Sequence, residues 1–132
     1  MITQIRSVAI GVTDYEKALK FFRDALGFEI TADIADPRSA ENRWLTLKPR
    51  SGQTNLMLIR PSSSAVNSSQ RGKSTHIVMD TDNIQTECER LRLGGAMVLY
   101  EPKQAGWGNA LETHFSDRDG NIFMLVQSLT SI

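Results

Sequence analysis

The feature that most constrains this chain is an internal repeat. Thr13-Asp14 recurs as Thr81-Asp82, and the later residue Gly27 recurs as Gly95 with the same offset of 68 positions. Each half shows the same expected order of a strand, a helix and three strands. A half of this size buries only one face of its sheet, so the two halves are expected to cover each other. The repeat predicts an α+β fold of two tandem βαβββ modules with a half-open, barrel-like cleft. If the two Thr-Asp pairs match only by coincidence, the alternative is an ordinary sandwich of helices on a sheet.

The expected elements follow from hydrophobic periodicity and from end signals. Asp14 and Asp82 stand where helix N-caps belong, and Gly27 and Gly94-Gly95 stand where the helices end. The chain reads as a single domain in which a serine-rich connector at 61–74 joins module 1, about 1–60, to module 2, about 75–132. Strands are expected at residues 5–13, 28–34, 43–47 and 55–59 and at 75–79, 96–100, 111–116 and 122–126.

Charge and cysteine content exclude several classes of function. The 15 basic and 15 acidic residues cancel, which leaves no electrostatic footprint for nucleic acid or an anionic membrane. The one cysteine, Cys88, excludes an intrachain disulfide and a cysteine-rich zinc module. Cys88 shares a helical apolar stripe with Ile84 and Leu91, which favours a core role over a nucleophilic one. No N-terminal apolar run is long enough for a signal peptide or a membrane span, so a cytoplasmic location is expected.

Three segments resemble the vicinal oxygen chelate superfamily, which includes glyoxalases, bleomycin-resistance proteins, fosfomycin-modifying enzymes and extradiol dioxygenases. They are VTDYEKALKFFRDALGFEI at 12–30, HIVMDTDN at 76–83 and WGNALETHFSDRDGNIFMLVQ at 107–127. The resemblance runs from Val8 to Gln127, and Arg118 stands where the closing segment of the family usually has proline. Because members share the fold more than the chemistry, the resemblance leaves the function to be read from the site residues.

The resemblance implies four metal-ligand positions, one on the first and one on the last strand of each module. A divalent site needs about three protein ligands, usually with a carboxylate or a second imidazole. Among the residues at these four positions only His76 is a competent metal ligand, so no metal cofactor is expected. An alternative metal-ligand set is His76, Glu112 and His114, because Glu112 and His114 are two apart on a strand and point to one face. If that face does not line the cleft, Glu112 and His114 belong to an exposed polar face. The four inherited positions are Ser7, Met57, His76 and Met124.

The predicted cleft carries mostly small and apolar side chains, which suits an organic molecule more than a hydrolytic centre. His76 is a candidate for a lone acid or base, and the alternative is an imidazole without a function, satisfied by a backbone carbonyl. If Leu45 and Leu47 face the core, Trp44 faces the cleft. Trp107 lies between two glycines, which favours ligand or dimer contact. The alternative for both tryptophans is that they cap the ends of the sheet, and for Trp44 the sequence does not decide between the two. The candidate ligand-binding residues are therefore His76, Met57, Met124, Ser7, Trp107 and Trp44.

These observations favour metal-independent binding of a small aromatic or amphipathic molecule, such as an antibiotic or a metabolite. The alternative is a metal-dependent lyase, isomerase or dioxygenase with a non-standard ligand set around His76. A third interpretation is a metal-free isomerase or epimerase with His76 as its base. The resemblance implies a homodimer with a small-molecule ligand and with neither nucleic acid nor membrane as partner.

Overall fold

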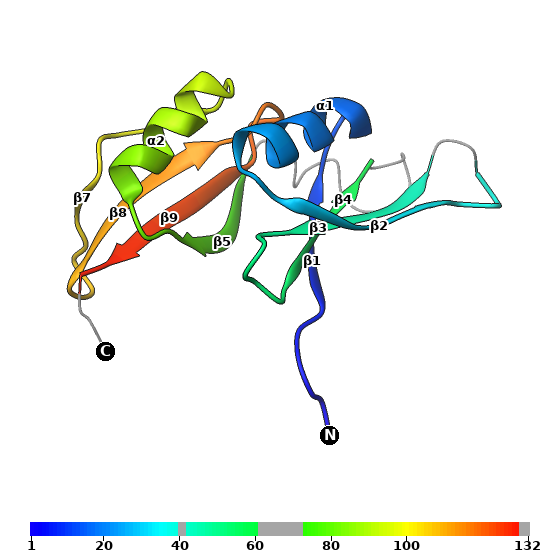
Figure 1. The fold of residues 1–132 in the computed structure, drawn as a ribbon, viewed down its shortest axis with the longest axis horizontal. Coiled ribbons are helices and arrows are strands. Elements are labelled where there is room, and N and C mark those ends of the chain that lie inside the picture. The colour runs from blue at the N-terminus through cyan, green and yellow to red at the C-terminus, as the bar shows by residue number, and fades with distance from the viewer. Residues whose placement is uncertain (40–41, 61–72, 130–132) are drawn as a thin grey trace. The chain divides into compact units, whose positions relative to one another are not determined.

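The computed structural model describes residues 1–39, 42–60 and 73–129. The chain forms two compact units, Met1–Arg71 and Gly72–Ile132, each with one helical segment and one sheet (Figure 1). The α+β class and the repeated strand–helix–strands order that the repeat predicts are confirmed. Most of the predicted connector, 61–72, lies outside the described residues. In the described part of the chain, no helix is long and apolar enough to cross a membrane.

Unit 1 has a four-stranded sheet in the order β1-β4-β3-β2, with β1 parallel to β4 and the other pairs antiparallel. The helix starts at the predicted cap, where Asp14 Oδ1 accepts a hydrogen bond from Lys17 N at 3.0 Å. Gly27 ends the helical segment with a φ of +74°, a left-handed conformation that favours glycine. The elements are β1 (Ser7–Gly11), α1 (Tyr15–Lys20), the π-helical turn η1 (Phe21–Ala25), β2 (Glu29–Ala35), β3 (Arg43–Lys48) and β4 (Asn55–Ile59).

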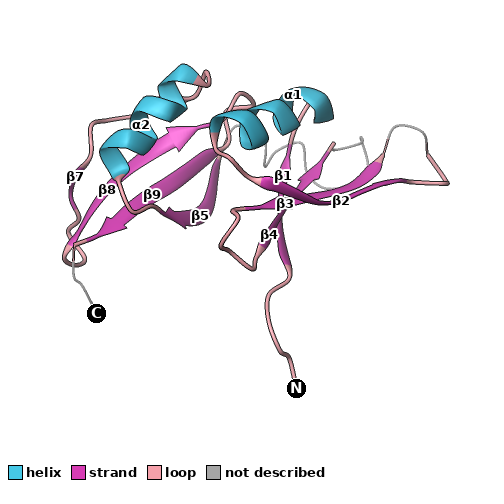
Figure 2. Cartoon of the chain, in the orientation of Figure 1, coloured by secondary structure: helices cyan, strands magenta, loops and turns pink. Residues whose placement is uncertain are grey.

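The core of unit 1 lies between its helical segment and one face of the sheet (Figure 2). Since strand side chains alternate between faces, every second residue of these strands points away from α1. We call this second side the distal face of unit 1. The core contains Ile10, Val12, Ala18, Leu19, Phe22, Leu45, Leu47, Leu56 and Leu58, all less than a tenth exposed.

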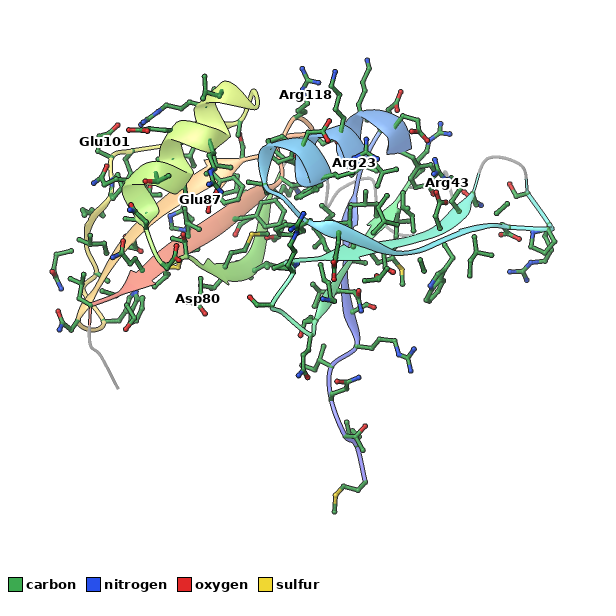
Figure 3. The ribbon with its side chains drawn as sticks, viewed as in Figure 1. Arg23, Arg43, Asp80, Glu87, Glu101 and Arg118 are labelled. Carbon is green, nitrogen blue, oxygen red and sulfur yellow. The ribbon has the colours of Figure 1, made fainter. Side chains whose placement is uncertain are left out.

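A cluster of charged side chains, centred on Arg43, lies on the helix side of this sheet. Arg43, which Figure 3 labels, donates to Asp33 through two nitrogens at 3.0 and 2.6 Å and to Glu16 at 2.6 Å. Its guanidinium also lies 5.3 Å from the centroid of the Tyr15 ring. The hydrogen bond from Arg43 lowers the pKa of Asp33. Arg43 therefore ties β3 both to β2 and to the first turn of α1.

Unit 2 has a sheet in the order β5-β9-β8-β6, and β7 also pairs with β8. β5 runs parallel to β9, and the other pairs are antiparallel. Helix α2 contacts β6, β8 and β9 on one side (Figure 2). The predicted stripe is confirmed, because Ile84, Cys88 and Leu91 are each 0% exposed. The elements are β5 (Ser74–Asp80), α2 (Ile84–Leu93), β6 (Met97–Val98), β7 (Lys103–Gln104), β8 (Ala110–Ser116) and β9 (Ile122–Ser128).

Two predictions for unit 2 are wrong in detail. The N-cap of α2 is Asn83 instead of Asp82: Asn83 Oδ1 accepts from Thr86 N at 3.1 Å, while Ile84 N donates to Gln127 Oε1 at 2.8 Å. Asp82 and Asn83 both have side chains suited to an N-cap. Because Ile84 N donates to Gln127 on β9, the helix begins at Ile84 with Asn83 as its cap. The strand expected at 96–100 contains only Met97–Val98, and the short strand β7 was not predicted.

The turn between β8 and β9 is organised by the carboxylate of Asp117. Its Oδ1 accepts from Asp119 N at 2.9 Å and from Asn121 N at 2.8 Å, and its Oδ2 accepts from Asn121 Nδ2 at 3.0 Å. Gly120 completes the turn with a φ of +80°. Asp117 is 6% and Asn121 0% exposed, so these bonds lie out of water.

The stability of the fold is expected to depend on the ionisation of Asp117. Desolvation by burial raises its pKa to about 6, against the hydrogen bonds that lower it. A carboxyl that binds its proton more tightly when folded adds stability below its unfolded pKa, and this stability is lost as pH rises through the folded pKa. Relative to an Asp117→Asn variant, the free energy of unfolding should therefore fall by up to about 3 kcal/mol between about pH 4 and pH 7. Equilibrium denaturation of both proteins across this range tests it, and a difference independent of pH would contradict it.

Candidate functional site

The distal face of unit 1 holds both of its inherited ligand positions. Ser7 is in register with Asn55, and Met57 is in register with Ala9 on one side and Thr46 on the other. Both Ser7 and Met57 are half-buried. The in-register neighbours of Met57 on this face are therefore a methyl group and a hydroxyl.

Trp44 lies on the same distal face, because the residues beside it on β3 face the core. Leu45 and Leu47 are both 0% exposed, and the alternation of the strand therefore turns Trp44 to the opposite side. It is in register with Ile34, and these side chains are 50% and 60% exposed. The two make an exposed apolar pair at one end of the β2–β3 hairpin.

A short polar chain crosses the distal face beside Met57. A register shift between Ile30 and Ala32 lets Thr31 reach across β3. Thr31 Oγ1 donates to Asn55 Oδ1 at 2.5 Å, so Thr46 Oγ1, 2.7 Å away, donates to Thr31. This chain links β2, β3 and β4 across the distal face, and its central member Thr46, two residues from Trp44, is 4% exposed.

His76 occupies the apex of an irregularity in β5. The register with β9 shifts between Ser74 and Val78, and His76 has a φ of +58°, which is rare for a residue with a side chain. Thr75 replaces the missing ladder bonds, since its Oγ1 donates to Ile122 O at 2.8 Å and accepts from Ile77 N at 3.1 Å. His76 is exposed, and its ring has no hydrogen-bond partner among residues 1–39, 42–60 and 73–129.

We call the sheet face opposite α2 the distal face of unit 2. Asp80, in register with Val126, points away from α2 (Figure 3). Met124 lies on this face between Val78 and His114. Met124 also packs against a small buried apolar cluster of Ala105, Ala110 and Val126.

Glu112 and His114 both lie on the distal face of unit 2. The residue between them, Thr113, is 0% exposed, and Phe115 beyond them is 1% exposed, so these two occupy the helix side. Tyr100 joins the pair: its Oη lies 3.0 Å from Glu112 Oε1 and 2.6 Å from His114 Nδ1. Desolvation and the bond to Glu112 raise the pKa of Tyr100 to about 12. Sequence reasoning missed Tyr100, because no periodicity links it to β8.

The residues of the inherited positions do not fit a divalent metal. They supply a hydroxyl, two thioethers and one imidazole, whereas such a site needs about three nitrogen, carboxylate or thiolate ligands. In the part of the chain that the structure describes, no group of three or more His, Cys, Asp or Glu side chains could hold a metal ion. The structure brings Glu112 and His114 together through Tyr100, and His76 does not complete a ligand group with them.

The remaining candidates differ in exposure. Trp107, in the loop between β7 and β8, is 63% exposed. A side chain built at Gly106 or Gly108 would meet nothing within 4 Å, so the backbone beside Trp107 is open to a ligand or another chain. Cys88 is 0% exposed, and burial raises the pKa of its thiol, as its predicted core role requires.

The chain is similar to several known proteins. The protein YetH of Bacillus subtilis (strain 168) is 37% identical over 125 residues, which is 95% of this chain and 98% of that protein. A crystal structure of a superfamily member from Sphaerobacter thermophilus DSM 20745 has a TM-score of 0.82 and 33% identity, covering 96% of this chain and 98% of that one. TnmS3, an antibiotic binding protein from Streptomyces sp. CB03234, has a TM-score of 0.77 and 31% identity over 96% and 97% of the two chains.

A family description also matches residues 4–125. That span reaches into both units and includes every strand from β1 to β8 and the first part of β9, up to Leu125. The chain belongs to the Glyoxalase/Bleomycin resistance protein/Dioxygenase superfamily.

Proposed function

We propose that this protein binds a small aromatic or amphipathic organic molecule, such as an antibiotic or a metabolite, without a metal ion. The observation that carries the proposal is the chemistry of the inherited ligand positions. Ser7, Met57 and Met124 offer a hydroxyl and two thioethers where metal-dependent members hold imidazoles and carboxylates. What remains at these positions is soft, polarizable surface, which suits contact with apolar ligands.

The exposed side chains on the two distal faces support the same proposal. Contiguous exposed apolar surface on a protein of this size marks a site of interaction. In unit 1 the in-register pair of Trp44 and Ile34, 50% and 60% exposed, offers apolar contact on the distal face. The exposed apolar residues of unit 2 include Val78 at 57%, Met97 at 64% and Leu99 at 43%.

The relatives add support for a binding role. TnmS3 is an antibiotic binding protein, and it shares 31% of its residues with this chain over nearly the full length of both. Members of this superfamily differ in chemistry on one fold, so this similarity supports the proposal without identifying the ligand. The metal-dependent alternative around His76, the homodimer and the cytoplasmic location stay predictions.

Tryptophan fluorescence tests the proposal, because Trp44 and Trp107 are the two tryptophans of the chain. We expect an aromatic probe to change the emission of the protein to the same extent with and without excess EDTA. The variants Trp44→Phe and Trp107→Phe each leave one reporter, and therefore identify which tryptophan senses the ligand. Binding that EDTA abolishes and a divalent metal restores would favour the metal-dependent alternative. No response across a panel of neutral and weakly charged aromatic probes would overturn the proposal.

A further inference from the structure

Tyr100, Glu112 and His114 form a hydrogen-bonded group that positions one ring nitrogen. Tyr100 follows β6, while Glu112 and His114 lie two apart on β8. The Tyr100 Oη is 3.0 Å from Glu112 Oε1 and 2.6 Å from His114 Nδ1, so one phenol hydroxyl bridges both side chains. Thr113 Oγ1 donates to the backbone carbonyl of Tyr100, which holds the bridging residue against β8.

Counting protons in this group assigns the tautomer of His114. A phenol has one proton to donate, and the raised pKa of Tyr100 keeps that proton in place at neutral pH. A carboxylate only accepts hydrogen bonds, so the Tyr100 proton goes to Glu112 Oε1. The 2.6 Å contact then needs a proton from His114 Nδ1, which leaves Nε2 with a free lone pair in the neutral ring.

The side chains in register with His114 on this face are apolar. Among the residues that the structure describes, none donates to His114 Nε2, and the only buried side-chain oxygen or nitrogen without a partner is Glu87 Oε2. His114 is in register with Met124, which is in register with Val78. A ligand that lies across these side chains meets thioether and methyl groups beside the His114 ring, while the carboxylates of Asp80 and Glu112 lie in the next row of the same face, on either side of Val126.

We infer that His114 Nε2 is the hydrogen-bond acceptor that selects ligands with a hydroxyl group on an aromatic skeleton, and that Tyr100 and Glu112 are the positioning residues that hold it in the Nδ1–H tautomer. This inference rests on the proposed function, because it names the chemical class of the ligand for the same distal face. It assigns roles to Tyr100, Glu112 and His114 that require no metal ion.

The tautomer is testable in the protein alone by ¹⁵N chemical shifts of the histidine rings in mildly alkaline buffer, where an ordinary imidazole is neutral. The chain has two histidines, and a His76→Gln variant identifies the signals of His114. We expect the Nδ1 of His114 to carry the proton in the wild type. Tyr100→Phe should shift the population towards Nε2–H, whereas Glu112→Gln, whose amide oxygen still accepts from Tyr100, should retain the Nδ1–H form. An Nε2–H ring in the wild type would overturn the inference.

Ligand selection is testable with 2-naphthol and 2-methoxynaphthalene, which share a ring system and differ in the hydroxyl proton. We expect the wild type to prefer 2-naphthol by about tenfold, the usual effect of one well-placed hydrogen bond. Tyr100→Phe should reduce this preference to nearly one while 2-methoxynaphthalene binds as before. Tyr15→Phe is the matched control, since the other tyrosine of the chain lies on the helix side of unit 1, where its hydroxyl meets Arg43 N and Arg60 N. Equal binding of both probes overturns this inference alone, and binding of neither overturns it together with the proposed function.

Discussion

Replacing Asp117 by alanine is expected to lower the free energy of unfolding by about 3–5 kcal/mol. The carboxylate accepts from Asp119 N, Asn121 N and Asn121 Nδ2 at 2.8–3.0 Å, and alanine supplies no acceptor in its place. Asn121 is 0% exposed, so two of the three donors would lose this acceptor in the protein interior. An unsatisfied buried donor costs about 1–3 kcal/mol, which makes this loss larger than that of an ordinary surface change.

Urea denaturation of the variant and the wild type measures this effect. The control is Arg118→Ala in the same turn: its side chain is exposed and makes no hydrogen bond or ion pair with the described residues, so its effect should stay within about 0.5 kcal/mol. Equal stability of Asp117→Ala and Arg118→Ala would show that the carboxylate does not hold the turn together.

The second large effect is expected at Phe115, in the core of unit 2. This ring is 1% exposed and stacks on Phe123 with centroids 5.3 Å apart and planes inclined by 25°. Truncation to alanine removes most of the side chain from a packed site that collapses only in part. We expect a loss of about 3–5 kcal/mol and a fall of Tm by roughly 10–15 °C.

Met97→Ala is the matched control for Phe115→Ala. Met97 pairs with Ser116, the next residue of β8, yet it is 64% exposed. Its truncation should change the free energy of unfolding by less than about 0.5 kcal/mol. Thermal unfolding followed by circular dichroism compares both variants, and a similar Tm for the two would contradict the assignment of Phe115 to the core.

Caps, turn glycines and hydrophobic periodicity predicted the ends of helices and strands well where a single residue type determines the local backbone. Asp14 caps the first helix as predicted, β4 spans the expected residues, and Gly27 and Gly95 have the positive φ that ends each helical segment. The local signals failed where two neighbouring residues could both serve as the N-cap of a helix, and where the pairing between strands determines the structure. Asn83, and not the predicted Asp82, is the N-cap of α2, and the first residue of that helix, Ile84, donates to Gln127 on the distant strand β9.

The candidate site was harder to predict, because its geometry depends on pairing between strands. Leu45 and Leu47 are buried, which is the condition under which alternation turns Trp44 to the distal face, and the register of β8 with β9 puts Met124 on the same face as His114. It does not predict the left-handed backbone at His76, which follows from the register shift between β5 and β9. Tyr100 reaches Glu112 and His114 from outside β8, and only the pairing of β6 with β8 brings it there.

Metal content tests the central claim most directly. The untagged protein would be incubated with Zn²⁺, Ni²⁺, Mn²⁺ or Fe²⁺, dialysed, and analysed for metal bound per chain. Because Ser7, Met57 and Met124 supply no nitrogen or carboxylate, we predict retention near zero for all four ions. Near-stoichiometric retention of any one ion, abolished by His76→Ala, would contradict metal-independent binding and favour a metal-dependent enzyme.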